Sequence, residues 1–597
     1  MSAASWKSRV LAKKPHQPSR AYPRWQVLRR MLSYLKPYAR WVVFCYVVWG
    51  LITGLEVVIP LMVGRAVDLG ISAGDAAYLA WAVAVIVGLY LVKAASNYGY
   101  FALYHYYEAA TARDVRNDMY QRLQRLSFAY FDRVDTGQLI SRGTSDISAL
   151  QLFLGHGTTT SVNAIGTYVV VLAVAASMSP PLTLVSVLPL PLLLVLAMRF
   201  GRELRPLFAA VQQQHGVMTG VLQENLAGIR VVKAFAREDY ECQKFGREAQ
   251  GLYDANMRMV EVMSSRMPTL VLLAGLSTIL VLWLGGKLVI DGSITVGTLI
   301  AFSYFVARLV SSTRRVGWII NQVSRAFAAA QRIFEVMDTV PEVSDRPGAR
   351  PFDNPRGEVR FEGVWFEYEP GCPVLKDVNL TVQPGQTVAI VGATGSGKSA
   401  LVGLIPRYYD ATKGRVLLDG VDVRDLALGS LRRQVGVVPQ DPFLFSRSLH
   451  ENIAFGRPQA EANLVHEAAE KAQVHRFASQ LPDGYQTVVG DRGVGLSGGQ
   501  RQRATMARAI IVEPRILILD DATSSVDVAT EELIQQSLRG LMGDKTTFII
   551  AHRLSTVQHA DLVLVLEDGR VVEQGSHEEL VRRGGAYARM YESQLKE

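Results

Sequence analysis

Residues 387–405 read TVAIVGATGSGKSALVGLI and place a glycine-rich loop between an apolar strand and an apolar helix. The predicted strand is Thr387–Val391, and the loop Gly392–Ser399 has the spacing G-x-x-x-x-G-K-S. Glycines let backbone N–H groups converge on an anion, and the helix start adds a positive dipole end. The loop lysine suits β- and γ-phosphate oxygens, and the last serine hydroxyl suits Mg²⁺. This strand–loop–helix context argues against a simple surface turn and predicts a nucleotide-phosphate site in an α/β domain.

Two further stretches of the same half of the chain suit a nucleotide site. The apolar run Ile516–Leu519 ends in Asp520 and Asp521, and a carboxylate at a strand end can complete a nucleotide–metal site. The stretch Leu496–Gln500 (LSGGQ) opens a predicted helix, whose Gly-Gly start offers N–H donors to an anion. A second phosphate-binding element in one domain indicates that it binds ATP from the other side, across a dimer interface.

The first half of the chain is apolar in long blocks. Of the 597 residues, 49% are hydrophobic and 20% charged, which excludes a disordered or fibrous chain. A hydrocarbon layer of about 30 Å needs about 20 apolar residues, and from 147 to 198 there is no Asp, Glu, Lys or Arg. We therefore predict an all-α membrane domain of six helices ahead of the α/β domain. Its expected spans are 41–64, 78–103, 150–177, 182–203, 267–289 and 294–318.

The charge distribution predicts the orientation of these spans. The net charge is +9, and the first 40 residues hold ten Lys or Arg and no acid. The long segments 104–149 and 204–266 are also rich in Arg and Lys, whereas the other joining segments are short. The positive-inside rule then places both termini, the two long segments and the α/β domain in the cytosol of a multi-pass protein. The positive charge is thus assigned to the membrane surface and not to nucleic acid.

Composition also divides the chain. Pro, Gly and charged residues gather in 341–357, as in a linker, and three distant cysteines exclude a disulfide framework. The expected domains are a basic cytosolic segment 1–40, the membrane domain 41–330, a linker 331–357 and the α/β domain 358–597.

The two long cytosolic segments have helical spacing, over 109–124 and over 230–252. Each has a candidate contact element at its turn, over 128–141 (FAYFDRVDTGQLIS) and over 222–241 (LQENLAGIRVVKAFAREDYE). These elements are either solvated amphipathic helices or a docking surface for the domain that follows.

With these motifs in order, the chain resembles an ATP-binding cassette (ABC) exporter half-transporter of the multidrug or lipid type. FDRVDTGQLISR and GIRVVKAF resemble the two coupling regions of that family. Tyr368 matches its adenine-stacking aromatic, Gln440 its Q-loop and His552 its switch. The loop 392–399 matches Walker A, 496–500 the signature, 516–520 Walker B and 524–527 the D-loop.

The resemblance implies ATP and Mg²⁺ as cofactors and a sandwich of two cassettes, with each ATP held by Walker A of one chain and the signature of the other. It implies that Gln440 senses Mg²⁺ and passes the change to the coupling helices. The implied catalytic residues are Asp521, His552 and Gln440, and the implied Mg²⁺ ligands are Ser399, Gln440 and Asp520. The implied ATP-binding residues are Tyr368, Gly392, Thr394, Gly395, Ser396, Gly397, Lys398, Ser399, Ala400 and Asp527, with Ser497, Gly498, Gly499 and Gln500 serving the partner's ATP.

One departure from the family pattern bears on hydrolysis. The family's catalytic Glu is replaced here by Asp521, whose carboxylate reaches about 1.5 Å less far. A displacement near 1 Å can cost about 10²-fold in rate. The D-loop reads Ser524-Ser525-Val526-Asp527, where the family usually has Ala-Leu in the middle. Both features are similar to the impaired-site subunit of heterodimeric exporters, so we expect a heterodimer. A homodimer that tolerates Asp, and a mainly regulatory ATP-binding subunit, are the alternatives.

A second departure is Ala400, where the family commonly has a hydroxyl residue, and we expect it to have a small effect because the backbone N–H is kept.

Glu56 lies inside the first predicted span, four residues before Pro60. An ionisable group at membrane depth is costly and faces protein or a water-filled cavity. It is therefore either a cavity-lining substrate residue that favours cationic amphiphiles, or part of a helix–helix contact.

Together these features predict ATP-driven export or flipping of hydrophobic or amphipathic small molecules across the cytoplasmic (inner) membrane. The expected partners are a second half-transporter, the lipid bilayer and the amphipathic substrate. DNA-repair ATPases also carry an LSGGQ-like signature but lack six membrane spans, and importer cassettes are usually separate chains.

Overall fold

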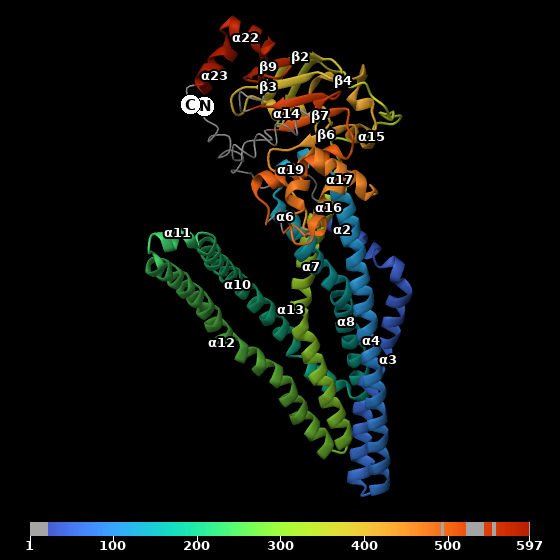
Figure 1. Ribbon diagram of the computed structural model, residues 1–597. Coiled ribbons are helices and arrows are strands. Elements are labelled where there is room, and N and C mark those ends of the chain that lie inside the picture. Colours follow the sequence, from blue (N-terminus) through green and yellow to red (C-terminus); the bar gives the residue numbers. More distant parts are fainter. Residues whose placement is uncertain (1–21, 491–494, 521–541, 552–556, 596–597) are drawn as a thin grey trace. The chain divides into compact units, whose positions relative to one another are not determined.

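The computed structural model describes residues 22–490, 495–520, 542–551 and 557–595. They divide into two compact units, drawn together in Figure 1. We call residues 22–123 with 137–338 the helical unit, and residues 124–136 with 339–595 the sheet unit.

The helical unit consists of long helices in the order that the apolar blocks predict. Five helical stretches are long and apolar enough to cross a membrane, and Val296–Ser312 is a shorter apolar one. These six confirm the predicted helical membrane domain. The principal helices are α2 (Arg24–Ser33), α3 (Ala39–Arg65), α4 (Ala76–Gln124), α7 (Ile147–Leu152), α8 (Thr158–Met178), α9 (Pro180–Val187), α10 (Leu190–Ala227), α11 (Ile229–Ala234), α12 (Glu238–Ile290) and α13 (Val296–Asp338).

Helix α13 is longer than expected. It continues to Asp338, whereas the linker was predicted to begin at 331. Ile333, Phe334 and Val336 are buried, and this apolar face keeps the chain helical up to the linker.

Helices α10 and α12 run side by side and are joined by the short α11 (Figure 1). The continuous helix predicted over 230–252 is wrong at this point, because α11 ends at Ala234 and α12 begins at Glu238. Ala236 has φ of 50°, which interrupts the helix and reverses the chain. Asn225 donates to Glu241 at 2.9 Å and braces the turn from the two flanking helices.

Helices α3 and α13 come close together where both carry glycine. A Cβ added to Gly64 would lie 2.5 Å from the carbonyl oxygen of Gly297. The backbone N–H of Gly297 donates to Asp68 at 2.7 Å, just beyond the end of α3. Only a residue without a side chain lets two helix backbones approach in this way.

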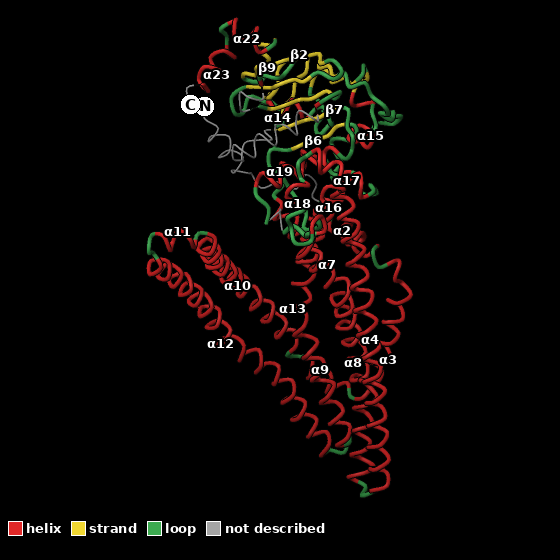
Figure 2. The backbone as a smooth tube through the Cα atoms, in the orientation of Figure 1, coloured by secondary structure: helices red, strands yellow, loops and turns green. Residues whose placement is uncertain are grey.

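The sheet unit contains two sheets, visible as the strands of Figure 2. The six-stranded sheet has the order β10-β9-β3-β8-β7-β6 and the four-stranded one β2-β1-β4-β5. The central strands are parallel and almost entirely buried, as expected for strands covered on both faces. The strands are β1 (Val359–Glu367), β2 (Pro373–Val382), β3 (Thr387–Val391), β4 (Lys413–Leu418), β5 (Val421–Asp422), β6 (Val435–Val438), β7 (Ile516–Asp520), β8 (Thr546–Ile550), β9 (Leu562–Glu567) and β10 (Arg570–Gly575). The predicted order, a helical membrane domain followed by an α/β domain, is therefore confirmed.

Candidate nucleotide site and the helix attached to it

The glycine-rich loop joins β3 to the short helix α14 (Lys398–Gly403). Gly392, Gly395 and Gly397 have φ of 151°, 86° and 104°, a region that other residues avoid. A Cβ on Gly397 would lie 2.9 Å from Leu375, so the loop is packed from behind, whereas one on Gly395 would meet nothing within 4 Å. The loop therefore presents an open backbone face on a packed support.

Two polar side chains of this loop are buried. Nζ of Lys398 donates to the carbonyl oxygens of Gly392 and Ala393 at 2.8 and 2.9 Å, which arches the loop around the ammonium group. The hydroxyl of Ser396 is buried and has no hydrogen-bond partner among the described residues. A buried hydroxyl without a partner and an ammonium group inside a glycine loop fit a phosphate chain.

Asp520 and Gln440, two further polar residues predicted for the site, lie at the carboxyl ends of neighbouring parallel strands, at the edge of the sheet where β3 ends. In the parallel register Ile390 of β3 pairs with Ile550 of β8, which pairs with Asp520 of β7. Asp520 thus lies level with the end of β3 and two strands away, about 10 Å across the sheet. Gln440 follows the neighbouring strand β6 directly after Pro439. Carboxyl ends of parallel strands are where α/β sheets bind ligands.

The LSGGQ stretch begins helix α19 (Gly498–Ile510). Ser497 is its N-cap: the Ser497 hydroxyl accepts from the Gln500 N–H at 3.3 Å, and the Gln500 amide oxygen accepts from the Ser497 N–H at 2.8 Å. This capping box fixes the helix start. Ser497 is exposed and Gly498 half-buried, whereas Gly499 is buried, so the helix begins at the surface of the sheet unit. The geometry suits an anion that comes from outside this chain.

Tyr368 belongs to an aromatic cluster at the end of β1. Its ring packs edge-on against Phe366 and Tyr409, with centroids 4.8 and 5.3 Å away. It keeps 38% of its surface exposed, enough for a flat ring to stack on it. Partial burial, with the charge of Asp132, raises the pKa of Tyr368 to about 12, so its hydroxyl stays protonated.

The helix α5 (Phe128–Arg133) packs on this cluster within the sheet unit. Phe128 stacks on Tyr408 with centroids 4.1 Å apart. The Tyr409 hydroxyl donates to Asp132 at 2.7 Å, and Arg133 donates to Glu342 at 2.7 Å. Burial, with the hydrogen bond to Asp132, raises the pKa of Tyr409. The first candidate contact element of the sequence is therefore a docking helix.

Comparison with known proteins agrees with this architecture. Residues 42–313 match the ABC transporter transmembrane region, and residues 375–524 match the ABC transporter ATP-binding family. The ATP-dependent lipid A-core flippase of Syntrophus aciditrophicus is 36% identical over 96% of this chain and 95% of its own. This chain is an ABC exporter half-transporter.

Other relatives place it among the same exporters. The fatty acid ABC transporter ATP-binding/permease protein of Mycobacterium bovis is 39% identical over 85% of this chain and 80% of its own. A bacterial Atm1-family ABC exporter solved with ATP bound has a TM-score of 0.78 and 28% identity, covering 93% of this chain and 98% of its own. The half-transporter is thus a multi-pass membrane protein whose ABC domain binds ATP and is an ATPase coupled to transport.

Several site residues of this half-transporter lie outside the described residues. They are the catalytic-base position Asp521, the D-loop residues Ser524, Ser525, Val526 and Asp527, and the switch His552.

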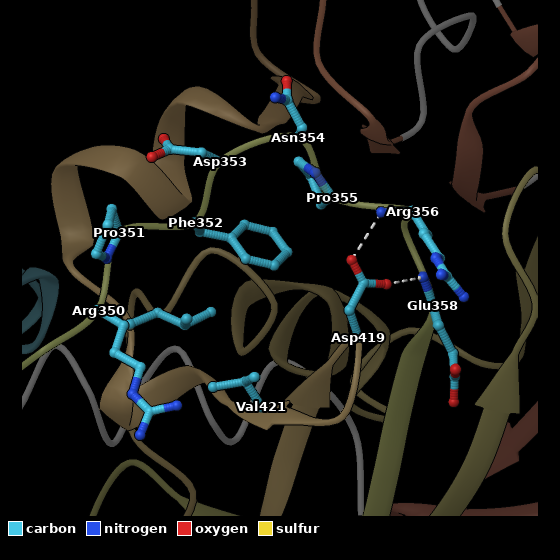
Figure 3. Close-up of a pocket in the computed structure, with 11 residues that line it drawn as sticks. Arg350, Pro351, Phe352, Asp353, Asn354, Pro355, Arg356, Glu358, Asp419 and Val421 are labelled. Carbon is cyan, nitrogen blue, oxygen red and sulfur yellow. Dashed lines mark hydrogen bonds between the residues drawn. The ribbon is translucent and has the colours of Figure 1, made fainter.

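A hollow of about 370 Å³ in the sheet unit is a separate feature (Figure 3). It is lined by residues of the linker and of β5, and by none of the predicted ATP-binding residues. Asp419 lies at its edge. Its carboxylate accepts hydrogen bonds from the backbone N–H groups of Arg356, Gly357 and Glu358 at 2.7, 3.0 and 2.8 Å, and Figure 3 draws two of these bonds. Asp419 therefore holds the end of the linker to the sheet.

Glu56, the one substrate candidate of the sequence, is engaged by two basic residues of the helical unit. Nη2 of Arg308 donates to both of its carboxylate oxygens, at 2.5 and 2.6 Å, and Nζ of Lys93 is 3.6 Å away. The carboxylate therefore takes part in a helix–helix contact of α3 with α4 and α13, the second of the two interpretations.

Sequence reasoning missed the partners of these sites. It did not identify Tyr408 and Tyr409 as the residues that α5 packs against, because neither residue belongs to a recognisable motif. Lys93 and Arg308 were seen only as interruptions of apolar runs. The negative charge of Glu56 at membrane depth could have indicated these two basic residues as its partners, because a charge at that depth needs a partner.

Proposed function

We propose that the half-transporter exports or flips amphipathic molecules with a hydrophobic body, using ATP, as one half of a dimer. The named substrates of two relatives, lipid A-core and fatty acid, share this chemistry and support the proposal. We assign it to the cytoplasmic membrane, with both termini and the ABC domain in the cytosol, on the strength of the basic N-terminal segment and long joining segments.

We infer the roles of the ATP-site residues from the geometry of the glycine-rich loop and from the family motifs. Lys398 and the open N–H groups around Gly395 would hold the phosphates, the Ser396 hydroxyl would find its missing partner there, and Tyr368 would stack on the adenine. Ser399, Gln440 and Asp520 would hold Mg²⁺, which would neutralise the negative charge of the phosphates. Asp521 and His552 would orient and polarise the attacking water.

The signature Ser497–Gln500 would complete the ATP site of a second chain. The surface position of the start of α19 supports this proposal, since a helix N-terminus favours an anion such as a phosphate from outside. We propose a heterodimer in which this chain's own site turns over slowly because Asp521 is short, while its signature serves a competent partner site. The sequence at 520–527 supports this, and a homodimer is the alternative.

The observation that carries the export function is the docking of α5. This helix lies in the chain between two membrane helices, yet it packs on the ABC domain through Phe128 and Asp132. Movement of the cassettes on ATP binding would pull on both membrane helices through this one contact.

The experiment is ATP-dependent uptake of a fluorescent lipid analogue into inverted vesicles that contain the protein. Uptake should require ATP and vanish in Lys398→Ala. For the heterodimer, the chain purified alone should hydrolyse ATP slowly, and strong cooperative hydrolysis would favour the homodimer. Absence of ATP-dependent uptake of any amphiphile tested would contradict the export proposal.

A further inference from the structure

The apolar stretches of the membrane domain contain very few charges. In residues 41–64, 76–107, 147–198, 267–286 and 292–312 the only Asp, Glu, Lys or Arg residues are Glu56, Lys93 and Arg308. They come from three different helices, α3, α4 and α13, and the structure brings all three together. We call Glu56, Lys93 and Arg308 the charge triad.

The charge triad is not neutral. One carboxylate faces two basic side chains, which leaves one positive charge in excess. Lys93 and Arg308 form no other ion pair among the described residues. An uncompensated cation at membrane depth is costly, so such a residue normally has an anionic partner.

The donors of Arg308 are only partly used. A guanidinium group has five N–H donors, and both bonds to Glu56 come from Nη2 alone. Nε is buried without a hydrogen-bond partner, and no bond within the described chain uses Nη1. Nη1 therefore keeps its two N–H donors for a carboxylate or phosphate oxygen, and together with Nη2 it forms the end-on fork of the guanidinium group.

The triad is also accessible from outside. The side chain of Arg308 is 38% exposed and that of Lys93 is 24% exposed, whereas that of Glu56 is only 12% exposed. Tyr304 lies one turn before Arg308 on α13 and is exposed, so it offers an aromatic surface near the guanidinium group. The cations thus face outward, and the carboxylate lies behind them.

We propose that the charge triad binds the single anionic headgroup of an amphiphile, a carboxylate or a phosphate, through Arg308 and Lys93. Glu56 neutralises one of these two cations, so the site keeps one net positive charge for the headgroup. This inference rests on the proposed export function and specifies its substrate class. It argues against one of the two interpretations drawn from sequence, that Glu56 favours cationic amphiphiles, because the carboxylate is already neutralised.

The test is equilibrium binding of four C12 probes to the full-length protein in nanodiscs of zwitterionic lipid. The probes are laurate, dodecyl phosphate, dodecanol and dodecyltrimethylammonium. At least one anionic probe should bind at least about tenfold more tightly than the neutral and cationic probes, since the attraction of one unit charge is worth at least this much once the dielectric falls below that of bulk water. Comparison of laurate with dodecyl phosphate identifies the headgroup.

Variants that change the charge of the triad distinguish a headgroup-binding site from a purely structural contact between helices. Arg308→Gln and Lys93→Gln should each weaken the anionic probe about tenfold, while Lys287→Gln, an exposed lysine near the end of α12, should change it less than about twofold. The double variant Glu56→Gln/Lys93→Gln restores the excess charge and should recover binding to within about threefold. If the triad only held the three helices together, the double variant would not recover binding, because both changes remove interhelical contacts. Thermal unfolding identifies any variant that fails to fold. If a single variant fails, binding to the double variant is compared with binding to Lys287→Gln and to the wild type.

Two results would overturn the inference. One is tighter binding of dodecyltrimethylammonium than of either anion, lost in Glu56→Gln. The other is a folded double variant without recovered binding. ATP-dependent uptake of the same probes keeps the two proposals apart: uptake of only neutral or cationic probes would overturn the triad site and leave the export function intact.

Discussion

The ring of Phe128 stacks on the ring of Tyr408, with centroids 4.1 Å apart and planes inclined by 28°. One turn later on α5, Asp132 accepts a hydrogen bond from the next tyrosine, Tyr409. Residues four apart share one helix face, so two adjacent tyrosines of the ABC domain hold one face of α5 by an apolar and a polar contact. Because α5 follows α4 directly in the chain, we expect nucleotide-driven movement of the ABC domain to reach the membrane helices through this face.

Replacing Phe128 with alanine should uncouple transport from hydrolysis. The stacked pair contributes about 0.5–1.5 kcal/mol beyond its area, so α5 should detach more easily. We expect transport per ATP to fall severalfold while basal ATPase stays within about twofold. The matched control is Phe131→Ala, because Phe131 lies on the same helix, is 45% exposed and packs on Tyr130. Equal loss in both variants would show that the stack has no special role.

The Tyr409→Phe variant should weaken the same attachment without removing the ring. The lost hydrogen bond is worth about 1 kcal/mol, so transport per ATP should fall less than in Phe128→Ala. Burial, with the bond to Asp132, raises the pKa of Tyr409, which means that the folded state favours the neutral hydroxyl. Its contribution is therefore fully present below the ordinary tyrosine pKa of about 10 and is lost only as the pH rises through the raised value. The difference between variant and wild type should be the same at pH 6 and pH 9, and a difference that disappears by pH 9 would contradict this reading.

Lengthening the side chain at 521 should accelerate hydrolysis. Asp521→Glu moves the carboxylate outward by about 1.5 Å, and a placement error near 1 Å costs about 10²-fold. We expect the ATPase rate of the chain purified alone to rise by about one to two orders of magnitude, with nucleotide affinity unchanged. Asp521→Asn is the control and should be slower than wild type. A wild-type rate already equal to that of Asp521→Glu would refute the impaired-site hypothesis.

The close approach of α3 and α13 makes Gly64 sensitive to a single methyl group. In Gly64→Ala the new Cβ would press on the Gly297 carbonyl, and such overpacking costs about 1–3 kcal/mol. We expect a lower Tm of the purified protein in detergent. Gly54→Ala on the same helix is the control, since an added Cβ there meets nothing within 4 Å, and its Tm should be unchanged or slightly higher.

Asp419 should be important for the stability of the ABC domain. In Asp419→Asn one carboxylate oxygen becomes a donor, so at least one of the N–H groups of residues 356–358 loses its acceptor. The expected cost is about 1–3 kcal/mol, visible as a lower Tm. Asp353→Asn is the control, because Asp353 lines the same hollow and forms no hydrogen bond among the described residues (Figure 3). Equal shifts would indicate a general effect of lost charge.

The family, the ATP motifs and the membrane spans were predictable from the sequence because each depends on neighbouring residues. The loop Gly392–Ser399 needs only its own glycines, its lysine and the flanking strand and helix. An apolar helix long enough to cross the bilayer is recognisable from composition alone. Where local spacing misled, as in the helix predicted over 230–252, a single residue with positive φ, Ala236, interrupted it.

The pairing of distant residues was decided by the tertiary structure. Phe128 and Tyr408 are far apart in the chain, and neither carries a motif that names the other. From sequence, Glu56 was either a site for cations or part of a helix–helix contact. The packing of three helices adds Lys93 and Arg308 and reverses the sign of the local charge. The physical reason is that the energy of a charge in a low-dielectric interior depends on its neighbours in space, which the order of residues does not specify.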